Sequence, residues 1–154
     1  MIKYKVVDSF YPETFSPIPG LHLGTIHDAI KLKNVFSAAI SVGVKGSRYE
    51  YPTFERELRV NVTDDPFNVR ILKIQLMACC KFIKENDGRV LIFCQAGTCR
   101  WVYAIASAYI MFAYDVAFHE TEYKLDYAFD DAFKSMLIRF KLKCFRSWLD
   151  SMPN

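Results

Sequence analysis

The chain has 154 residues, about half of them apolar, which is enough to bury a hydrophobic core and fits one domain spanning residues 1–154. Its formal net charge of +3 is too small to indicate nucleic acid or an anionic membrane as a partner, although a phosphorylated ligand is compatible with it. Five cysteines without zinc-type spacing predict reduced thiols in a cytoplasmic or nuclear protein.

The first part of the chain predicts a strand, a helix and a second strand. Three prolines keep residues 1–20 extended or turned, and LHLG (21–24) then predicts a short strand. Apolar residues recur on one side of TIHDAIKLKNV, so a helix is expected to begin near Thr25. The β-branched run FSAAISVGV (36–44) predicts a buried strand.

The middle of the chain repeats this alternation. ELRVNV (57–62) predicts a half-buried strand, and apolar residues three and four apart predict a helix over residues 68–86. RVLIF (89–93) is typical of a strand buried on both faces. The pattern predicts an α/β fold with a central, mostly parallel sheet flanked by helices, and the last third, from residue 99 onward, is predicted to be helical.

CQAGTCR (94–100) connects the carboxyl end of the predicted central strand to the amino end of a helix. Ligands of open α/β sheets bind at that edge, and the unpaired N–H groups of a helix N-terminus suit an anion such as phosphate. Gly97 permits a tight turn, and the Arg100 guanidinium would donate two parallel hydrogen bonds to phosphate oxygens. In that electropositive setting Cys94 is expected to ionise and attack phosphorus; the alternative is an inert buried thiol.

A phosphoenzyme mechanism also needs an acid that protonates the leaving oxygen. Asp64 is the candidate, because it follows a strand that could lie beside the central one and its loop could fold over the anion site. Asp65 is the competitor. The alternative interpretation of TDDP (63–66) is an ordinary polar turn in which either aspartate caps the following helix.

These residues resemble the dual-specificity subgroup of the cysteine-based protein tyrosine phosphatases. The phosphate loop of that family reads His-Cys-x-x-Gly-x-x-Arg-Ser/Thr, and this chain has FCQAGTCRW (93–101). IPGLHLGTIHDA (18–29) resembles the family's first strand and turn, VNVTDDPFNV (60–69) its general-acid loop, and AIASAYIM (104–111) the helix behind the phosphate loop. The resemblance extends over roughly residues 16–115.

The resemblance implies a phosphatase acting on phosphotyrosine in proteins, with phosphoserine and phosphothreonine as further substrates. It implies Cys94 as the nucleophile, Arg100 as the phosphate clamp and Asp64 as the general acid. The substrate cradle would be formed by Gln95, Ala96, Gly97, Thr98, Cys99 and Arg100. No metal or organic cofactor is implied, and the expected partner is a phosphorylated protein; oligomeric state is left open.

Two departures from the family pattern bear on turnover. Phe93 replaces a histidine that holds the loop and helps keep the thiolate ionised, and Trp101 replaces a Ser or Thr whose hydroxyl helps the sulfur to leave. Slow turnover is therefore expected. The alternative is a pseudophosphatase, which binds phosphoprotein without hydrolysing it, and the simpler interpretation of Trp101 is an aromatic side chain packed in the core.

Other features predict no site. RFKLKCFR (139–146) alternates basic and apolar residues and is predicted to present a solvated basic face. The three histidines are scattered without metal-ligand spacing, and no apolar run reaches the length that spans a membrane. We therefore expect neither a metal centre nor membrane attachment.

Overall fold

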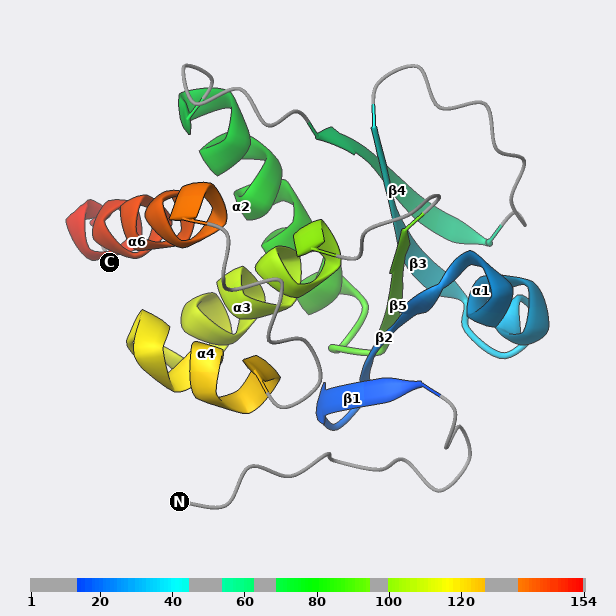
Figure 1. Ribbon diagram of the computed structural model, residues 1–154. Helices are drawn as coiled ribbons and strands as arrows, with labels where there is room; N and C mark the ends of the chain where they lie inside the picture. The colour runs from blue at the N-terminus through cyan, green and yellow to red at the C-terminus, as the bar shows by residue number, and fades with distance from the viewer. Residues whose placement is uncertain (1–13, 45–53, 63–68, 95–99, 127–135, 154) are drawn as a thin grey trace.

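The computed structural model of the chain describes residues 14–44, 54–62, 69–94, 100–126 and 136–153. The described elements, in chain order, are β1 (Phe15–Ile18), β2 (Leu21–Thr25), α1 (Ile26–Leu32), β3 (Ala38–Val44), β4 (Arg56–Val62), α2 (Val69–Glu85), β5 (Val90–Cys94), α3 (Arg100–Tyr114), α4 (Phe118–Asp126) and α6 (Met136–Ser151). Helix α1 covers one face of the sheet, and the other helices gather on the opposite side (Figure 1).

The five strands form one sheet in the order β1-β2-β5-β3-β4. Strand β1 is antiparallel to β2, and the other three pairings are parallel. Strand β5 is therefore central, and its five residues are all buried, as expected for a strand with helices on both faces. The predicted α/β fold with a mostly parallel sheet and a helical last third is confirmed.

The two faces of the sheet carry separate apolar clusters. The smaller cluster lies on the α1 side and includes Leu91 and Phe93 of β5. The larger cluster lies on the side of α2, α3 and α6 and includes Ile92 and Cys94. Because successive side chains of a strand point to opposite faces, Cys94 belongs to the face that carries α3.

Strand β1 was not predicted, because prolines interrupt residues 1–20. Pro17 lies within the strand and has no N–H to donate to a neighbour. Strand β1 is at the edge of the sheet, where proline is tolerated because only one side of the strand pairs. The four residues of β1 are buried, so burial compensates for the incomplete pairing.

The prediction that the strand before Asp64 lies beside the central strand was wrong. Strand β3 lies between β5 and β4, with Ile40 paired to Ile92 on one side and to Leu58 on the other. Strand β3 contains only small and apolar residues, whereas β4 contains three charged residues, Arg56, Glu57 and Arg59. This difference explains the order, because an interior strand is covered on both sides and an edge strand meets solvent.

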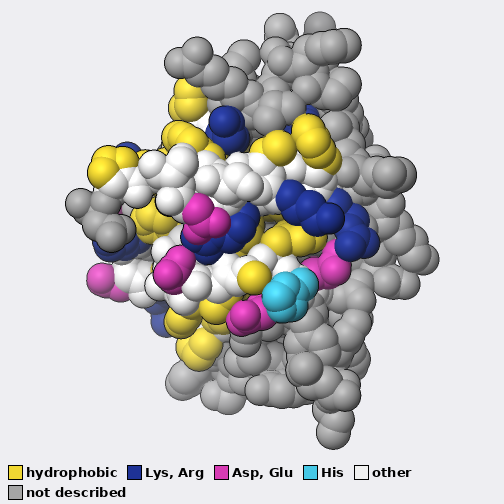
Figure 2. Space-filling model, turned by 90° about the vertical axis from the view of Figure 1, so that its left-hand side faces the viewer, with side chains coloured by type: hydrophobic (Ala, Val, Ile, Leu, Met, Phe, Trp, Pro, Cys, Tyr) yellow, Lys and Arg dark blue, Asp and Glu magenta, His cyan; other side chains and the backbone are white. Residues whose placement is uncertain are grey.

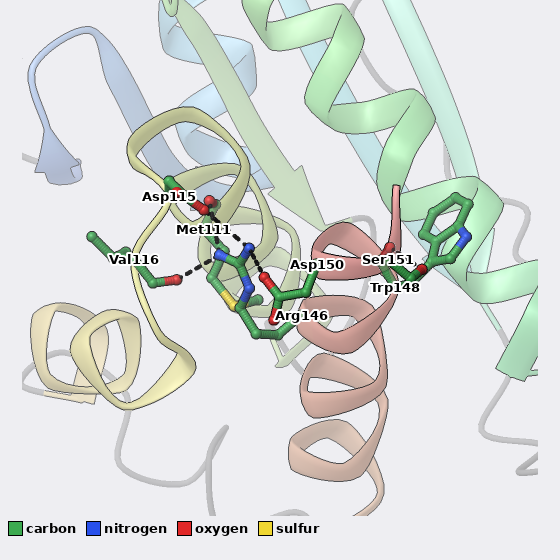
Figure 3. Close-up of polar contacts among 7 residues, drawn as sticks. All are labelled: Met111, Asp115, Val116, Arg146, Trp148, Asp150 and Ser151. Carbon is green, nitrogen blue, oxygen red and sulfur yellow. Dashed lines mark hydrogen bonds and ion pairs between the residues drawn. The ribbon is translucent and has the colours of Figure 1, made fainter. Parts of the chain in front are cut away.

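Helix α3 runs through the interior of the helical layer. Residues 101–111 are all buried, which is typical of a helix surrounded by other elements. The helix is followed by Asp115 in a left-handed conformation, with φ 52°. Arg146 of α6 donates hydrogen bonds to the carbonyl oxygens of Met111 and Val116, at 3.4 and 2.8 Å, and to the Asp115 carboxylate at 3.1 Å (Figure 3). Arg146 therefore supplies hydrogen-bond donors to carbonyl groups at and just after the C-terminal end of α3.

Replacing Arg146 by alanine is expected to lower the free energy of unfolding by about 1–3 kcal/mol, because partly buried carbonyl groups lose a charged donor. Arg146 also contacts the exposed Asp150 at 2.6 Å, and such an exposed pair contributes at most about 1 kcal/mol. Asp150→Ala is therefore the matched control in urea unfolding. A larger loss of stability in Asp150→Ala than in Arg146→Ala would contradict the assigned role.

The predicted basic face of residues 139–146 is only partly solvated. Lys143 is exposed and Arg139 is partly exposed, but the Lys141 side chain is buried. Figure 2 shows basic, acidic and apolar side chains interspersed on the helical side of the molecule. None of the described helices has both the length and the apolar character needed to cross a membrane.

Candidate active site

Cys94 is the last residue of the central strand. In the parallel register it lies between Thr25 of β2 and Val42 of β3, so the carboxyl ends of three strands meet at this position. The Cys94 residue is 6% exposed and belongs to the cluster on the α3 side. The structure therefore places the predicted nucleophile at the edge where α/β sheets bind ligands.

The neighbouring strand β2 ends at Thr25, which is also the N-cap residue of α1. Thr25 Oγ1 accepts a hydrogen bond from the Asp28 backbone N–H at 3.4 Å, and the Asp28 carboxylate accepts one from the Thr25 N–H at 2.8 Å. A Cβ atom at Gly24 would lie 2.6 Å from Asp28 Oδ2, so glycine is required for this close approach. The start of α1 is thus capped by its own side chains.

Helix α3 begins at Arg100, six positions after Cys94, and packs against β5. The predicted cradle residues between them, Gln95, Ala96, Gly97, Thr98 and Cys99, lie outside the described residues, as do both candidate acids, Asp64 and Asp65. The first turn of α3 contains no acidic residue, so no carboxylate of its own neutralises the positive end of the helix. An anion bound ahead of α3 would meet that positive end.

Phe93, which occupies the position of the family's histidine, packs into the apolar cluster on the α1 side. Its ring centroid lies 5.9 Å from that of Phe54, and the residue is fully buried. Ser41 lies beside it on β3, and the buried Ser41 hydroxyl has no hydrogen-bond partner among the described residues. Position 93 therefore provides hydrophobic packing and no side-chain hydrogen bond.

Trp101 packs in the core, as the simpler interpretation of this residue predicted. It is 7% exposed and belongs to the larger apolar cluster. The ammonium nitrogen of Lys141 lies 5.3 Å from the centre of the Trp101 ring, within the range of a cation–π interaction. The residue after Arg100 is therefore an indole in contact with a cation from α6.

Two other cysteines are unsuited to nucleophilic chemistry. Cys79 and Cys80 lie on α2 and are fully buried. Burial raises the pKa of Cys79 to about 12, and burial is also the main cause that raises the pKa of Cys80. Both thiols therefore stay protonated at neutral pH, and the thiolate is the reactive form.

Sequence reasoning missed the buried position of Lys141. Ile138, Lys141 and Phe145 follow one another at spacings of three and four residues, and all three are buried. The apolar residues on either side of Lys141 at this period were the available signal. The alternating basic pattern obscured it, because that pattern was interpreted as one solvated face.

Comparison with known proteins gives matches among solved structures alone. No protein-family model matches the sequence, and no curated protein matches it. The chain is similar to a candidate dual specificity phosphatase of mouse complexed with zinc tungstate, with 21% identity over 95% of this chain and 94% of that chain and a TM-score of 0.69. It is similar to human DUSP28, with 20% identity, 88% and 94% coverage and a TM-score of 0.62.

A third similar structure carries the name human tyrosine phosphatase-like serine/threonine/tyrosine-interacting protein. Its identity to this chain is 18%, over 88% of this chain and 97% of that chain, with a TM-score of 0.61. At identities of this size the structural similarity shows the fold alone. The strand order and the β5-to-α3 connection are the parts of this fold that position Cys94. The resemblance noted in the sequence is confirmed at this level: the chain has the fold of the dual-specificity, cysteine-based phosphatases.

Proposed function

We propose that this chain is a slow protein phosphatase that hydrolyses phosphotyrosine, and also phosphoserine and phosphothreonine, through a phosphocysteine on Cys94. The observation that carries the proposal is the position of Cys94 at the carboxyl end of the central strand, six residues before α3. A thiolate held close to the positive end of α3 would be stabilised by it, and so would a bound phosphoryl group.

The proposed reaction has two steps. The Cys94 thiolate forms a bond to phosphorus while the bond from phosphorus to the phenolic oxygen breaks, and Asp64 gives its proton to that oxygen. Water then attacks phosphorus, Asp64 takes up a proton from it, and the sulfur–phosphorus bond breaks to release phosphate. The Arg100 guanidinium and the N–H groups of residues 95–100 would hold the phosphoryl oxygens in both steps.

Chain lengths support Asp64 as the acid. Strand β4 ends at Val62, two strands from β5, which corresponds to about 10 Å across the sheet. Two residues of extended chain reach about 7 Å, and the aspartate side chain adds to this reach. A chain of this length would allow Asp64 to reach a phosphoryl group above Cys94, and it would allow Asp65 as well, which remains the competing candidate.

Two observations favour a second candidate function, a pseudophosphatase that binds phosphoprotein without turnover. Phe93 packs against Phe54 and supplies no hydrogen bond to the loop. Trp101 is buried against Lys141 and supplies no hydroxyl to the sulfur. Hydrolysis of a small aryl phosphate by the wild-type chain separates the two candidates: phosphate release supports the phosphatase, and tungstate binding without release supports the binding module.

Replacing Trp101 by serine is expected to raise the turnover of aryl phosphate about tenfold, because a hydroxyl that hydrogen-bonds a leaving thiolate contributes about 1.5 kcal/mol. The same change removes a buried indole and is expected to cost about 3–5 kcal/mol of stability. Rates are therefore compared at low temperature, where circular dichroism shows the variant folded. Trp148→Ser, which removes the other indole, is the control, and equal rates in all three proteins would contradict the expectation.

A further inference from the structure

Lys141 is a charged side chain within the core. It lies in the second turn of α6 and is 1% exposed, and its ammonium nitrogen lies 5.3 Å from the centre of the Trp101 ring. Lysine is almost never fully buried without a stabilising partner, because removing an ammonium group from water is costly. The face of an indole is one such partner. The amino group of Lys141 thus lies in the core beside Trp101, the second residue of α3.

The position of this charge is unusual for a helix. Backbone dipoles give a helix N-terminus a positive partial charge, so cations stabilise the C-terminal end and acidic residues the N-terminal end. Trp101 is the second residue of α3, and side chains of a helix lean toward its N-terminus. The Lys141 ammonium therefore lies over a side chain at the positive end of α3, where the first turn contains no acidic residue.

We infer that Lys141 is a positioning residue for the oxyanion site: its ammonium holds the Trp101 indole, and its charge adds to the field that attracts a phosphoryl dianion ahead of α3. The inference rests on the proposed function, and it deepens that function by assigning a role to α6. The positive charge of Lys141, the dipole of α3 and the Arg100 guanidinium then act in the same direction. A neutral phosphoester would gain nothing from this arrangement.

The test compares two substitutions that separate charge from packing. Lys141→Met keeps an unbranched apolar side chain and removes the charge, whereas Lys141→Arg keeps the charge and enlarges the side chain. A role in charge predicts that tungstate binds about tenfold more weakly to Lys141→Met and that Lys141→Arg restores most of the affinity. If Lys141 acts through packing alone, Lys141→Met is expected to bind tungstate more tightly than Lys141→Arg. Lys141→Gln provides a second neutral variant for the calorimetric titration.

The chain offers a matched control. The ammonium nitrogen of Lys73 lies 5.5 Å from the centre of the Trp148 ring, so Lys73→Met removes the same kind of cation–indole contact elsewhere. Unchanged affinity in Lys73→Met is expected. Wild-type affinity in folded Lys141→Met or Lys141→Gln, with tungstate bound normally by the parent, overturns the inference alone. Absence of tungstate binding in the parent overturns the proposed function, and the role of Lys141 with it.

Discussion

Replacing Cys94 by serine is expected to lower the turnover of a small aryl phosphate by at least about 10³-fold, to the level of the uncatalysed background. A serine hydroxyl is a weak nucleophile at neutral pH unless an adjacent base activates it, and removing the nucleophile of a covalent mechanism costs several orders of magnitude. The two side chains are close in size, so the fold and the binding of tungstate are expected to persist. Phosphate release is the measurement.

Cys144→Ser is the control for that experiment. Cys144 lies on α6, is partly exposed and is a free thiol, so its replacement removes one sulfur atom far along the chain from β5. Full activity is expected. If Cys94→Ser kept the activity of the parent, Cys94 would not be the nucleophile. If Cys144→Ser lost activity to the same extent, the loss in Cys94→Ser would not be specific to the end of β5.

Replacing Arg100 by lysine is expected to weaken tungstate binding about 100-fold. A guanidinium donates two parallel hydrogen bonds to an oxyanion, and a lysine ammonium at the same position is a point charge that cannot reproduce this geometry. The loss of one hydrogen bond between charged groups, at about 1.5–3 kcal/mol, corresponds to a factor of this size. Isothermal titration calorimetry with tungstate or vanadate measures it.

Arg89→Lys is the matched control for Arg100→Lys. Arg89 is exposed and directly precedes β5, so it lies at the opposite end of the strand from Cys94, with its guanidinium carbon 5.6 Å from the centre of the Phe36 ring. No change in tungstate affinity is expected. If Arg100→Lys and the parent bound tungstate equally well, Arg100 at the start of α3 would not be part of the proposed oxyanion site.

The fold could be predicted because its signals are local. The interior strand β5 contains only buried residues, and the capping box of Thr25 and Asp28 places the start of α1 where the sequence predicted it. Helix α2 spans Val69–Glu85, within one residue at each end of the predicted range. Periodicity and capping depend on near neighbours in the chain, and a single sequence contains them.

The order of the strands could not be predicted in the same way. Strand β4 lies two strands from β5 because β3 occupies the interior position, and this choice depends on crossovers between distant segments. Edge strand β1 contains Pro17, a residue that argues against a strand until the edge position is known. Both errors concern pairing partners, which local patterns do not specify.

Of the candidate site, only the strand-to-helix connection that positions Cys94 and Arg100 could be predicted. The strand-to-helix connection placed Cys94 and Arg100 at the sheet edge, and the structure has β5 ending at Cys94 and α3 beginning at Arg100. The contact of Lys141 with Trp101 joins residues 40 positions apart and depends on how α6 packs against α3. No local pattern contains such a contact. The roles of Asp64 and of the loop residues 95–99 stay predictions.

The most direct test of the account is to trap the phosphorylated enzyme. The wild-type chain is mixed with radiolabelled aryl phosphate, quenched within the first turnover, and mapped for the position of the labelled phosphoryl group. Label is expected on Cys94, where it accumulates because Trp101 slows hydrolysis of the phosphocysteine, and no label is expected in Cys94→Ser. Phosphate release without label on Cys94, or label on another residue, would contradict the account.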